Sequence, residues 1–503
     1  MPADRALRAD AAAAWRARAR VALLLAALLL YACAFQGARP LYSPDEGRYT
    51  DVALAMLDSG DWLRPMLNHE FEHWSKPPLT YWAIAASVAA FGHHEFAVRL
   101  PGALAFALTT LLLVPLGRRF VPAQPWLPAW VYATFAFPPA AANLVTTDTL
   151  LTLWESAQLA AFAGLWWAAD PQSARRMRRL LWLAAALAFM TKGPPGLLPL
   201  AASAAFAGLR GGWRGLRRIA HWDGLLAFLL VGGGWYAYVA LHEPGLMRYF
   251  LVEEVVNRVA SDKMHRNAEW YGAFKVYLPT LVLGTLPWLV PFARAAWRRR
   301  AGLAARIRAS DEAMLLACWL LPLAVFALSR SRLPLYVLPL FAPLALIVAR
   351  TLAPLRPTPA QALALGAWCL LAVLARVVPA RLDVGADDRR LAEALAAELP
   401  VAPFEVLFVD TAPRFGLRFY LGSEVERMHL PERTPAAQSE AFAQEMAEDE
   451  GCRALLAEPD DRAALERRLV DAGIAYRRLA DARGYAVLAL GEKSCPRYAD
   501  APR

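Results

Sequence analysis

The sequence predicts a polytopic α-helical membrane protein that carries a soluble α/β domain at its C-terminal end. Of its 503 residues, 58% are hydrophobic and only 19% are charged, whereas soluble domains are roughly 45–50% apolar and about 25% charged. Residues 1–380 carry 37 basic and 21 acidic side chains, and residues 381–503 carry 17 and 23. A basic, apolar segment followed by an acidic one indicates a membrane. The composition excludes a disordered chain and disfavours a purely soluble enzyme.

Eleven apolar stretches are expected to cross the membrane, and thirteen is the alternative count. A hydrocarbon core of about 30 Å takes about 20 apolar residues as helix. The first stretch, Val21 to Phe35, is uncharged and follows three arginines. A secretory signal peptide looks similar, but no small-residue cleavage site stands before Gln36, so we expect a retained span. The other spans are expected at 97–116, 126–144, 149–169, 180–191, 194–209, 223–241, 277–296, 312–328, 333–349 and 361–379.

Arginine placement predicts the orientation of these spans. Cytoplasmic loops carry an excess of Lys and Arg. With eleven spans, the arginine clusters fall in alternate loops, for example at 118–119, 175–179 and 298–308, so that side is the cytoplasm. The N-terminus is then cytoplasmic, whereas the long first loop, 40–95, and the tail, 381–503, lie in the periplasm. Two further spans would leave this assignment unchanged.

The tail is expected to form a small mixed α/β domain. Strands are expected at Phe404–Asp410 and Tyr485–Leu490, and helices at Arg389–Leu399 and Asp460–Ala472. Two of the five cysteines, Cys452 and Cys495, lie in this tail. An oxidising compartment would allow them to pair, but spacing alone leaves the pairing open.

Acidic residues follow two of the predicted spans on the outer side. Asp45 and Glu46 come soon after the first span, and Pro44 is expected to start a helix with both acids in its first turn. Asp148 stands at another outer end, where Thr147 is expected to cap the next helix. Complementing helix dipoles is the alternative role for these acids. Together, two such carboxylates can converge on one pocket, where a carboxylate can act as a general base.

Lysine is rare in this chain, with 5 residues against 49 arginines. Lys76 and Lys192 both stand next to Pro or Gly at outer ends of spans. A compact ammonium binds phosphate as a point charge, although snorkelling to the interface is the alternative. A further outer cluster contains Arg332 and Tyr336 among prolines that break the helix, and irregular backbone at membrane depth usually lines a cavity.

Cations beside acids at an outer membrane surface indicate a lipid substrate with an interfacial phosphate and a polar second half. Cleaving a sugar–phosphate bond places negative charge on the leaving phosphate, which fixed Lys and Arg stabilise. The predicted cytoplasmic side shows no glycine pattern typical of nucleotide binding. A lipid-linked sugar is therefore favoured over a nucleotide sugar as the donor.

Several motifs follow one another along the chain. The first loop contains Asp45-Glu46-x-Arg48-Tyr49, Gly60-Asp61-Trp62 and Lys76-Pro77-Pro78-x-x-Tyr81-Trp82. Later come Thr146-Thr147-Asp148, Thr191-Lys192-Gly193-Pro194 and Arg332-Leu333-Pro334-x-Tyr336. Together they resemble the GT-C membrane glycosyltransferases, in particular the aminoarabinose transferases and protein mannosyltransferases. The resemblance covers about residues 20–350, and the tail resembles the periplasmic α/β domain of the aminoarabinose branch more loosely.

The resemblance implies a GT-C fold in a bacterial inner membrane, with the active site and the tail in the periplasm. It implies transfer of a sugar from undecaprenyl phosphate to an acceptor such as lipid A, another glycan or a protein. Asp45, with Glu46 beside it, and Asp148 match the catalytic acids by position. The resemblance implies donor-phosphate binding for Lys76, Arg48, Tyr49, Arg258, Arg332 and Tyr336, and a role in shaping the site for Lys192 and Tyr81.

One departure concerns metal binding. The family often has Glu just before the loop lysine, and here Ser75 stands there. We therefore expect no resident metal, and a divalent cation is the alternative. The expected partners are the lipid-linked donor, the acceptor and membrane lipids, without nucleic acid. An enzyme resembling protein O-mannosyltransferases and a lipid-linked glycan transporter are the alternative functions, although a transporter would show intramembrane charges along a crossing path or inverted repeats.

Overall fold

The computed structural model describes most of the chain, and its residues pack as two compact units. One unit comprises residues 1–36 and 99–376, and the other comprises residues 37–98 and 377–503. We call them the helical unit and the sheet unit. The described residues are Ala19, 21–68, 71–243, 245–250, Val252, 266–302, 310–353, 358–382, 385–399, 402–431, Arg433, 439–447 and 452–490.

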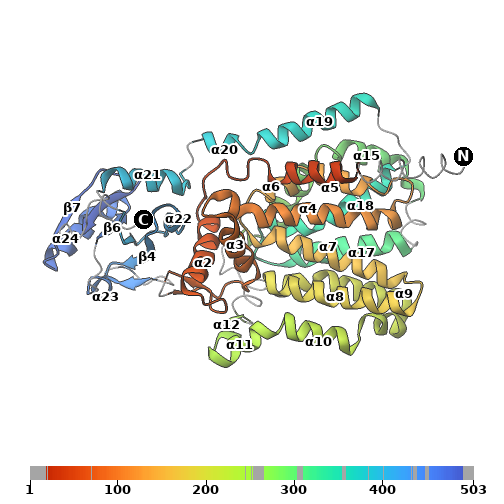
Figure 1. Cartoon of the computed structure of the whole chain (residues 1–503), viewed down its shortest axis with the longest axis horizontal. Helices are drawn as coiled ribbons and strands as arrows, with labels where there is room; N and C mark the ends of the chain where they lie inside the picture. Colours follow the sequence, from red (N-terminus) through yellow and green to blue (C-terminus); the bar gives the residue numbers. More distant parts are fainter. Residues whose placement is uncertain are drawn as a thin grey trace, which may run out of the picture. The chain divides into compact units, whose positions relative to one another are not determined.

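The helical unit begins with an apolar helix, Val21–Cys33. Helices α7, α8 and α9 pack side by side, as do α17 and α18 (Figure 1). The elements are α4 (Glu95–Phe120), α5 (Leu127–Thr134), α6 (Phe137–Ala141), α7 (Thr147–Trp166), α8 (Pro171–Lys192), η1 (Pro194–Leu197), α9 (Leu198–Ile219), α10 (Trp222–Val231), α11 (Gly234–His242), α12 (Leu246–Tyr249), α14 (Gly272–Gly284), α15 (Leu289–Arg298), η3 (Arg300–Gly302), α17 (Ser310–Leu328), η4 (Pro334–Leu340), α18 (Phe341–Leu352) and α19 (Pro359–Leu374).

Four helical segments among the described residues are long and apolar enough to cross a membrane. They are Glu95–Phe120, Asp311–Leu328, Pro334–Leu352 and Pro359–Arg381, and two bent helix pairs raise the number to as many as six. The chain is thus a membrane protein with multiple spans, as the sequence predicts. The count of eleven and the orientation of the spans stay predictions.

Several predicted spans have different boundaries in the structure: those at 223–241 and 277–296 are each divided into a bent helix pair, and two others show the local cause. The span expected at 126–144 is divided into α5 and α6, because Phe135 has extended backbone angles and Pro138 stands at the start of α6. The span expected at 180–191 is the second half of α8. This helix begins earlier because Asp170 caps it, accepting a 2.8 Å hydrogen bond from the backbone N–H of Ser173.

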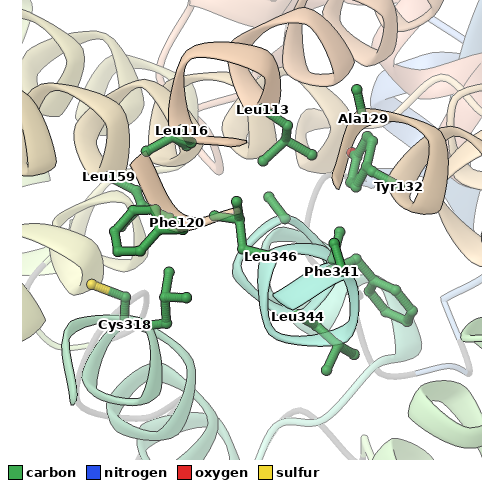
Figure 2. Packing of buried hydrophobic residues seen from close by; sticks show 14 of the residues in the cluster. Leu113, Leu116, Phe120, Ala129, Tyr132, Leu159, Cys318, Phe341, Leu344 and Leu346 are labelled. Carbon is green, nitrogen blue, oxygen red and sulfur yellow. The ribbon is translucent and has the colours of Figure 1, made fainter. Parts of the chain in front are cut away.

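The core of the helical unit surrounds α18 (Figure 2). The ring of Phe341 packs edge-on against Phe135, with centroids 5.6 Å apart. Ala342, Ala345 and Ala349 are fully buried along the same helix. Small side chains let helix backbones approach closely, and in lipid this packing replaces the hydrophobic effect as the force between helices. Figure 2 shows Leu113, Leu116, Phe120, Ala129, Tyr132, Leu159, Cys318, Leu344 and Leu346 around Phe341.

The sheet unit contains the predicted C-terminal domain as a six-stranded mixed sheet. The strand order is β5-β4-β3-β6-β8-β7, with β4, β3 and β6 parallel and β8 antiparallel to β6. The strands are β3 (Glu405–Val409), β4 (Glu424–His429), β5 (Glu440–Ala441), β6 (Arg453–Ala457), β7 (Tyr476–Arg478) and β8 (Ala486–Leu490), and the helices are α20 (Val378–Arg381), α21 (Asp388–Glu398), α22 (Gly416–Leu421), α23 (Phe442–Glu445) and α24 (Arg462–Asp471).

Both faces of this sheet are covered. Val406 and Phe408 of β3 pack in a cluster with α21, whereas Leu407 and Val409 pack in a cluster with α24. Successive strand residues point to opposite faces, so a fully apolar strand is typical of a sheet buried on both sides. The two predicted strands and two predicted helices of the tail are confirmed as β3, β8, α21 and α24. The pairing of Cys452 with Cys495, which the sequence leaves open, stays open because Cys495 lies outside the described residues.

The first loop packs with this tail in the same unit. It forms α2 (Asp45–Ser59), the hairpin of β1 (Met66–Leu67) and β2 (Phe71–Glu72), and α3 (Leu79–Phe91). The carboxylate of Asp388 accepts hydrogen bonds from Ser43 Oγ at 2.9 Å and from Arg414 Nε at 2.7 Å. Gly47 lies so close to Gly416 that a Cβ atom would come within 2.4 Å of its backbone nitrogen. The predicted boundary at residue 380, between a membrane domain and a periplasmic domain, stays a prediction.

Candidate active site

The two adjacent acids at the start of α2 lie in different surroundings. Both stand in the first turn, as predicted, directly after Pro44. Glu46 is buried and accepts two hydrogen bonds from the Arg39 guanidinium, at 2.5 and 2.7 Å, and one from the backbone N–H of Tyr42 at 3.1 Å. Asp45 forms an ion pair with Arg48, and its side chain is 49% exposed. Of the two carboxylates, that of Asp45 is the one accessible to a substrate.

A cluster of aromatic and basic side chains lies around the segment that follows β2. The ring of Tyr81 lies 5.8 Å from Tyr49 and 6.3 Å from His73, and the Arg48 guanidinium lies 5.8 Å from the Tyr49 ring. Lys76 is 8% exposed, and its Nζ donates to the carbonyl of Ser75 at 2.6 Å. We call the six residues Asp45, Arg48, Tyr49, His73, Lys76 and Tyr81 the loop cluster.

The histidine of the loop cluster is held neutral. Burial lowers the pKa of His73 well below its usual value, and the positive charges of Arg48 and Lys76 lower it further. Its Nε2 shares a 2.7 Å hydrogen bond with Ser75 Oγ. The net charge of the cluster therefore comes from one exposed acid and two cations, and it favours an anionic ligand.

A second cluster, the bundle cluster of Asp148, Lys192 and Tyr336, lies in the helical unit. Asp148 is in the first turn of α7, and the helix cap is Thr146, one residue before the predicted Thr147. Lys192 is the last residue of α8, which ends where Gly193 takes a φ of +73°. Its ammonium forms an ion pair with Asp148 and lies 4.5 Å from the centre of the Tyr336 ring. The side chains of both Lys192 and Asp148 are buried.

Arg332 binds backbone rather than presenting its charge. Its Nη1 donates to the carbonyls of Asn267 and Glu269, both at 2.7 Å, and its Nη2 donates to Ala327 at 3.1 Å. Arg266, which the sequence reasoning missed, donates to the hydroxyl of Tyr336 at 3.4 Å. Arg258, predicted to bind donor phosphate, lies outside the described residues.

The sequence reasoning also missed a second acid on α7. Glu155 lies two turns beyond Asp148 on α7 and is 5% exposed. Its Oε1 has no hydrogen-bond partner among the residues that the structure describes. An acid inside a predicted span, here 149–169, is a functional candidate by default, so this signal was present in the sequence.

The predicted site residues are thus divided between the two units. Asp45, Arg48, Tyr49, Lys76 and Tyr81 share the loop cluster of the sheet unit. Asp148, Lys192 and Tyr336 share the bundle cluster of the helical unit. The convergence of both sets on one pocket stays a prediction.

Within the described ranges, one group of side chains has the spacing of a metal site, and this group lies in the sheet unit. Glu405, Glu426 and Glu445 are buried, with carboxylate oxygens within 4.8 Å of one another. Asn68 Nδ2 donates to Glu426 at 2.6 Å, and Arg453 Nη1 lies 3.5 Å from Glu445. The amide of Asn68 and the guanidinium of Arg453 therefore offset part of the negative charge of these acids. None of the three glutamates belongs to the loop cluster or the bundle cluster.

A multi-span helical protein with buried lysine–acid–aromatic clusters and an appended α/β domain defines a class, the membrane glycosyltransferases of GT-C type. Residues 75–235 match the family model described as dolichyl-phosphate-mannose-protein mannosyltransferase. The predicted resemblance to the GT-C glycosyltransferases is confirmed by this match and by the relatives and solved structures described next.

Particular relatives come from the aminoarabinose branch. The chain is 36% identical over 323 residues to an undecaprenyl phosphate-alpha-4-amino-4-deoxy-L-arabinose arabinosyl transferase of Pseudomonas aeruginosa, over 62% of this chain and 56% of the relative. With the protein of that name from Edwardsiella ictaluri it shares 33% identity, over 62% and 55%. The matched region thus spans little more than half the length of these relatives.

The fold extends the likeness to nearly the whole chain. The crystal structure of ArnT from Cupriavidus metallidurans bound to undecaprenyl phosphate superimposes with a TM-score of 0.76, at 19% identity, over 96% of this chain and 99% of that one. The apo state gives the same TM-score. The fold is therefore that of ArnT, including the C-terminal mixed sheet.

Proposed function

We propose that this protein transfers a sugar from undecaprenyl phosphate to an acceptor outside the bacterial inner membrane, with lipid A as the first candidate acceptor. The observation that carries the proposal is the bundle cluster, in which one of five lysines is held between an acid and an aromatic ring. Such a buried ammonium is suited to a phosphate that gains negative charge. The relatives named for undecaprenyl phosphate and aminoarabinose support this choice of donor lipid and make aminoarabinose the first candidate sugar.

The reaction breaks the bond between the sugar C1 and the phosphate oxygen. The electron pair stays on the phosphate, where Lys76 and Arg48 of the loop cluster stabilise it. An acceptor oxygen forms the new bond to C1. If the acceptor is a hydroxyl, its proton passes to the carboxylate of Asp45, which acts as general base. If the acceptor is a phosphate of lipid A, it is already anionic, and Asp45 positions it instead.

We further propose that both clusters act on one donor molecule. The support is the order of motifs, which resembles that of the family in both clusters. If Lys76 and Lys192 contact one phosphate, their substitutions are non-additive, because coupled residues deviate from additivity by about 0.5–3 kcal/mol. Turnover of the single alanine variants and of the double variant tests this point, and strictly additive losses would contradict it.

The main experiment measures sugar release from a purified polyprenyl-phosphate donor. Asp45→Asn is expected to lose most turnover, since the substitution removes the accessible carboxylate. Asp61→Asn is the matched control, because Asp61 lies in an exposed turn of the same loop and accepts backbone hydrogen bonds from Leu63 and Arg64. Unchanged turnover of the Asp45→Asn variant would reject its role.

A protein mannosyltransferase is the second candidate, and the family model matched by residues 75–235 favours it. Mass spectrometry of lipid A and envelope proteins from a deletion strain separates the two. Loss of a lipid A substituent that returns with the wild-type chain, but not with Asp45→Asn, supports the first function. Loss of hexose from proteins, with unchanged lipid A, supports the second.

A further inference from the structure

A basic cavity lies in the helical unit, apart from the bundle cluster. It has a volume of about 750 Å³ and lies where α4, α15 and α18 end and α17 begins. Four arginines line it, Arg119, Arg298, Arg299 and Arg350, together with one acid, Asp311. Neither the reaction above nor the loop or bundle cluster uses these residues.

The cavity and the bundle cluster lie at opposite ends of one continuous helical segment. Tyr336 is in η4, which runs directly into α18, and Arg350 is in the last turn of α18. The rise per residue places the two about 20 Å apart along the helix axis. The arginines at this end are among those that predict the cytoplasmic side of the membrane.

The charges in the cavity are only partly neutralised. Arg119 binds Asp311 at 3.0 Å, and Arg350 binds Glu312 at 2.8 Å. Arg299 donates to the carbonyl of Thr351 at 2.7 Å, which uses one of the five N–H donors of its guanidinium. In the part of the chain that the structure describes, the exposed Arg298 has no acid within ion-pair distance. The positive charges of Arg298 and Arg299 therefore remain without a compensating acid among the residues that the structure describes.

Tryptophans mark this end as one that meets the membrane surface. The Arg119 guanidinium lies 4.1 Å from the ring centre of Trp167, and that of Arg300 lies 4.2 Å from the ring centre of Trp297, which is 68% exposed. Trp is enriched at membrane–water interfaces. A basic pocket between helix ends at such an interface suits the phosphate of a lipid head group.

We infer that this cavity binds the phosphate head group of an anionic phospholipid from the cytoplasmic leaflet. An arginine guanidinium can bind phosphate through two parallel N–H···O bonds. Arg119 and Arg350, which already form ion pairs with Asp311 and Glu312, fix the shape of the cavity. Arg298 and Arg299 supply the donors that the protein's own acids leave unused. The bound lipid would fasten the ends of α15 and α18 together at this surface.

The test uses the full-length protein in detergent, with bound lipid counted by native mass spectrometry. The probe is phosphatidylglycerol, and phosphatidylcholine is the neutral comparison. Arg298→Gln/Arg299→Gln is expected to weaken phosphatidylglycerol binding about 30-fold, because each basic residue near an anionic surface contributes roughly fivefold. Arg298→Gln alone, at an exposed position, is expected to weaken it about fivefold.

Arg214→Gln/Arg217→Gln is the matched control, because it removes two charges from exposed positions on α9. It is expected to change binding less than twofold. Three results would overturn the inference. They are an equal loss of phosphatidylglycerol binding in this control, equal binding of phosphatidylcholine by the wild-type protein, or a preference for phosphatidylglycerol that neither Arg298→Gln nor Arg298→Gln/Arg299→Gln changes. Complete displacement of the lipid by millimolar inorganic phosphate would show a site for a free anion and would also contradict it.

Discussion

Substituting the two adjacent acids of α2 separately is expected to give opposite phenotypes. Side chains that follow one another on a helix point about 100° apart. Glu46 therefore points inward to Arg39, while Asp45 points outward, with half of its side chain exposed. Glu46→Gln is expected to damage stability, and Asp45→Asn is expected to damage turnover.

The magnitude follows from the burial of the ion pair. Arg39 and Glu46 have side chains that are 3% and 4% exposed. Removing one partner of a buried pair leaves an uncompensated charge and costs about 3–5 kcal/mol. For a unit of this size, that loss corresponds to a fall of roughly 6–20 °C in unfolding temperature. The half-exposed pair of Asp45 with Arg48 contributes about 0–1 kcal/mol, so Asp45→Asn is expected to unfold near the wild-type temperature.

The assay is thermal unfolding of the purified protein by intrinsic fluorescence, with sugar release measured on the same samples. Glu72→Gln is the control, because Glu72 forms an exposed ion pair with Arg64 in the same loop. Arg39→Met/Glu46→Leu is expected to recover much of the lost stability, since it removes both charges together. The reasoning is refuted if Glu46→Gln destabilises the protein no more than Glu72→Gln does.

Three further predictions concern the lysines and one buried acid. Lys76→Ala is expected to reduce donor turnover at least tenfold, and unaltered donor affinity and turnover would count against phosphate binding. Lys192→Arg is expected to lose activity as well, although it keeps the charge, because a planar fork does not reproduce a point charge between a carboxylate and a ring; wild-type turnover in this variant would contradict that view. Burial raises the pKa of Asp51 to about 7, against the opposing effect of Arg418. The folded protein then holds a proton that the unfolded chain releases near pH 4, so the free energy of unfolding is expected to fall as pH rises from about 4 to 7, and Asp51→Asn is expected to flatten this fall in unfolding measured across that range.

The class of the fold was predictable because its main signals are local. Long apolar runs reveal spans, and the apolar run 406–409 of β3 reveals a buried strand. The sequence did not reveal β4 as a strand, because Glu424, Glu426 and Arg427 interrupt its apolar pattern. One of these acids has a specific partner instead, because Glu426 accepts a hydrogen bond from the side-chain amide of Asn68. This partner lies 358 positions away in the sequence, a separation that hydrophobic periodicity cannot detect.

The residues of the candidate site were predictable from the sequence, but their individual roles were less so. Rare lysines and acids at outer helix ends identified Asp45, Asp148, Lys76 and Lys192. The partner of Glu46 could not be read from the sequence, because Arg39 looks like any other arginine near a span end. Helix caps showed the same limit, since Thr146 and Thr147 are equally good caps and only the backbone decides between them.

The distribution of arginine and lysine now has a physical explanation. Arginine occurs where a planar fork must reach several acceptors at once, as in Arg39 with both oxygens of Glu46 and Arg332 with three carbonyls. Lys192 occurs where one compact charge must fit between a carboxylate and the Tyr336 ring. This explanation applies to Lys192, whereas the exposed Lys275 forms an ordinary surface ion pair with Glu269. Under the proposed function, the donor phosphate meets a compact point charge at Lys192, which stabilises the growing negative charge without the bidentate geometry that a planar fork requires.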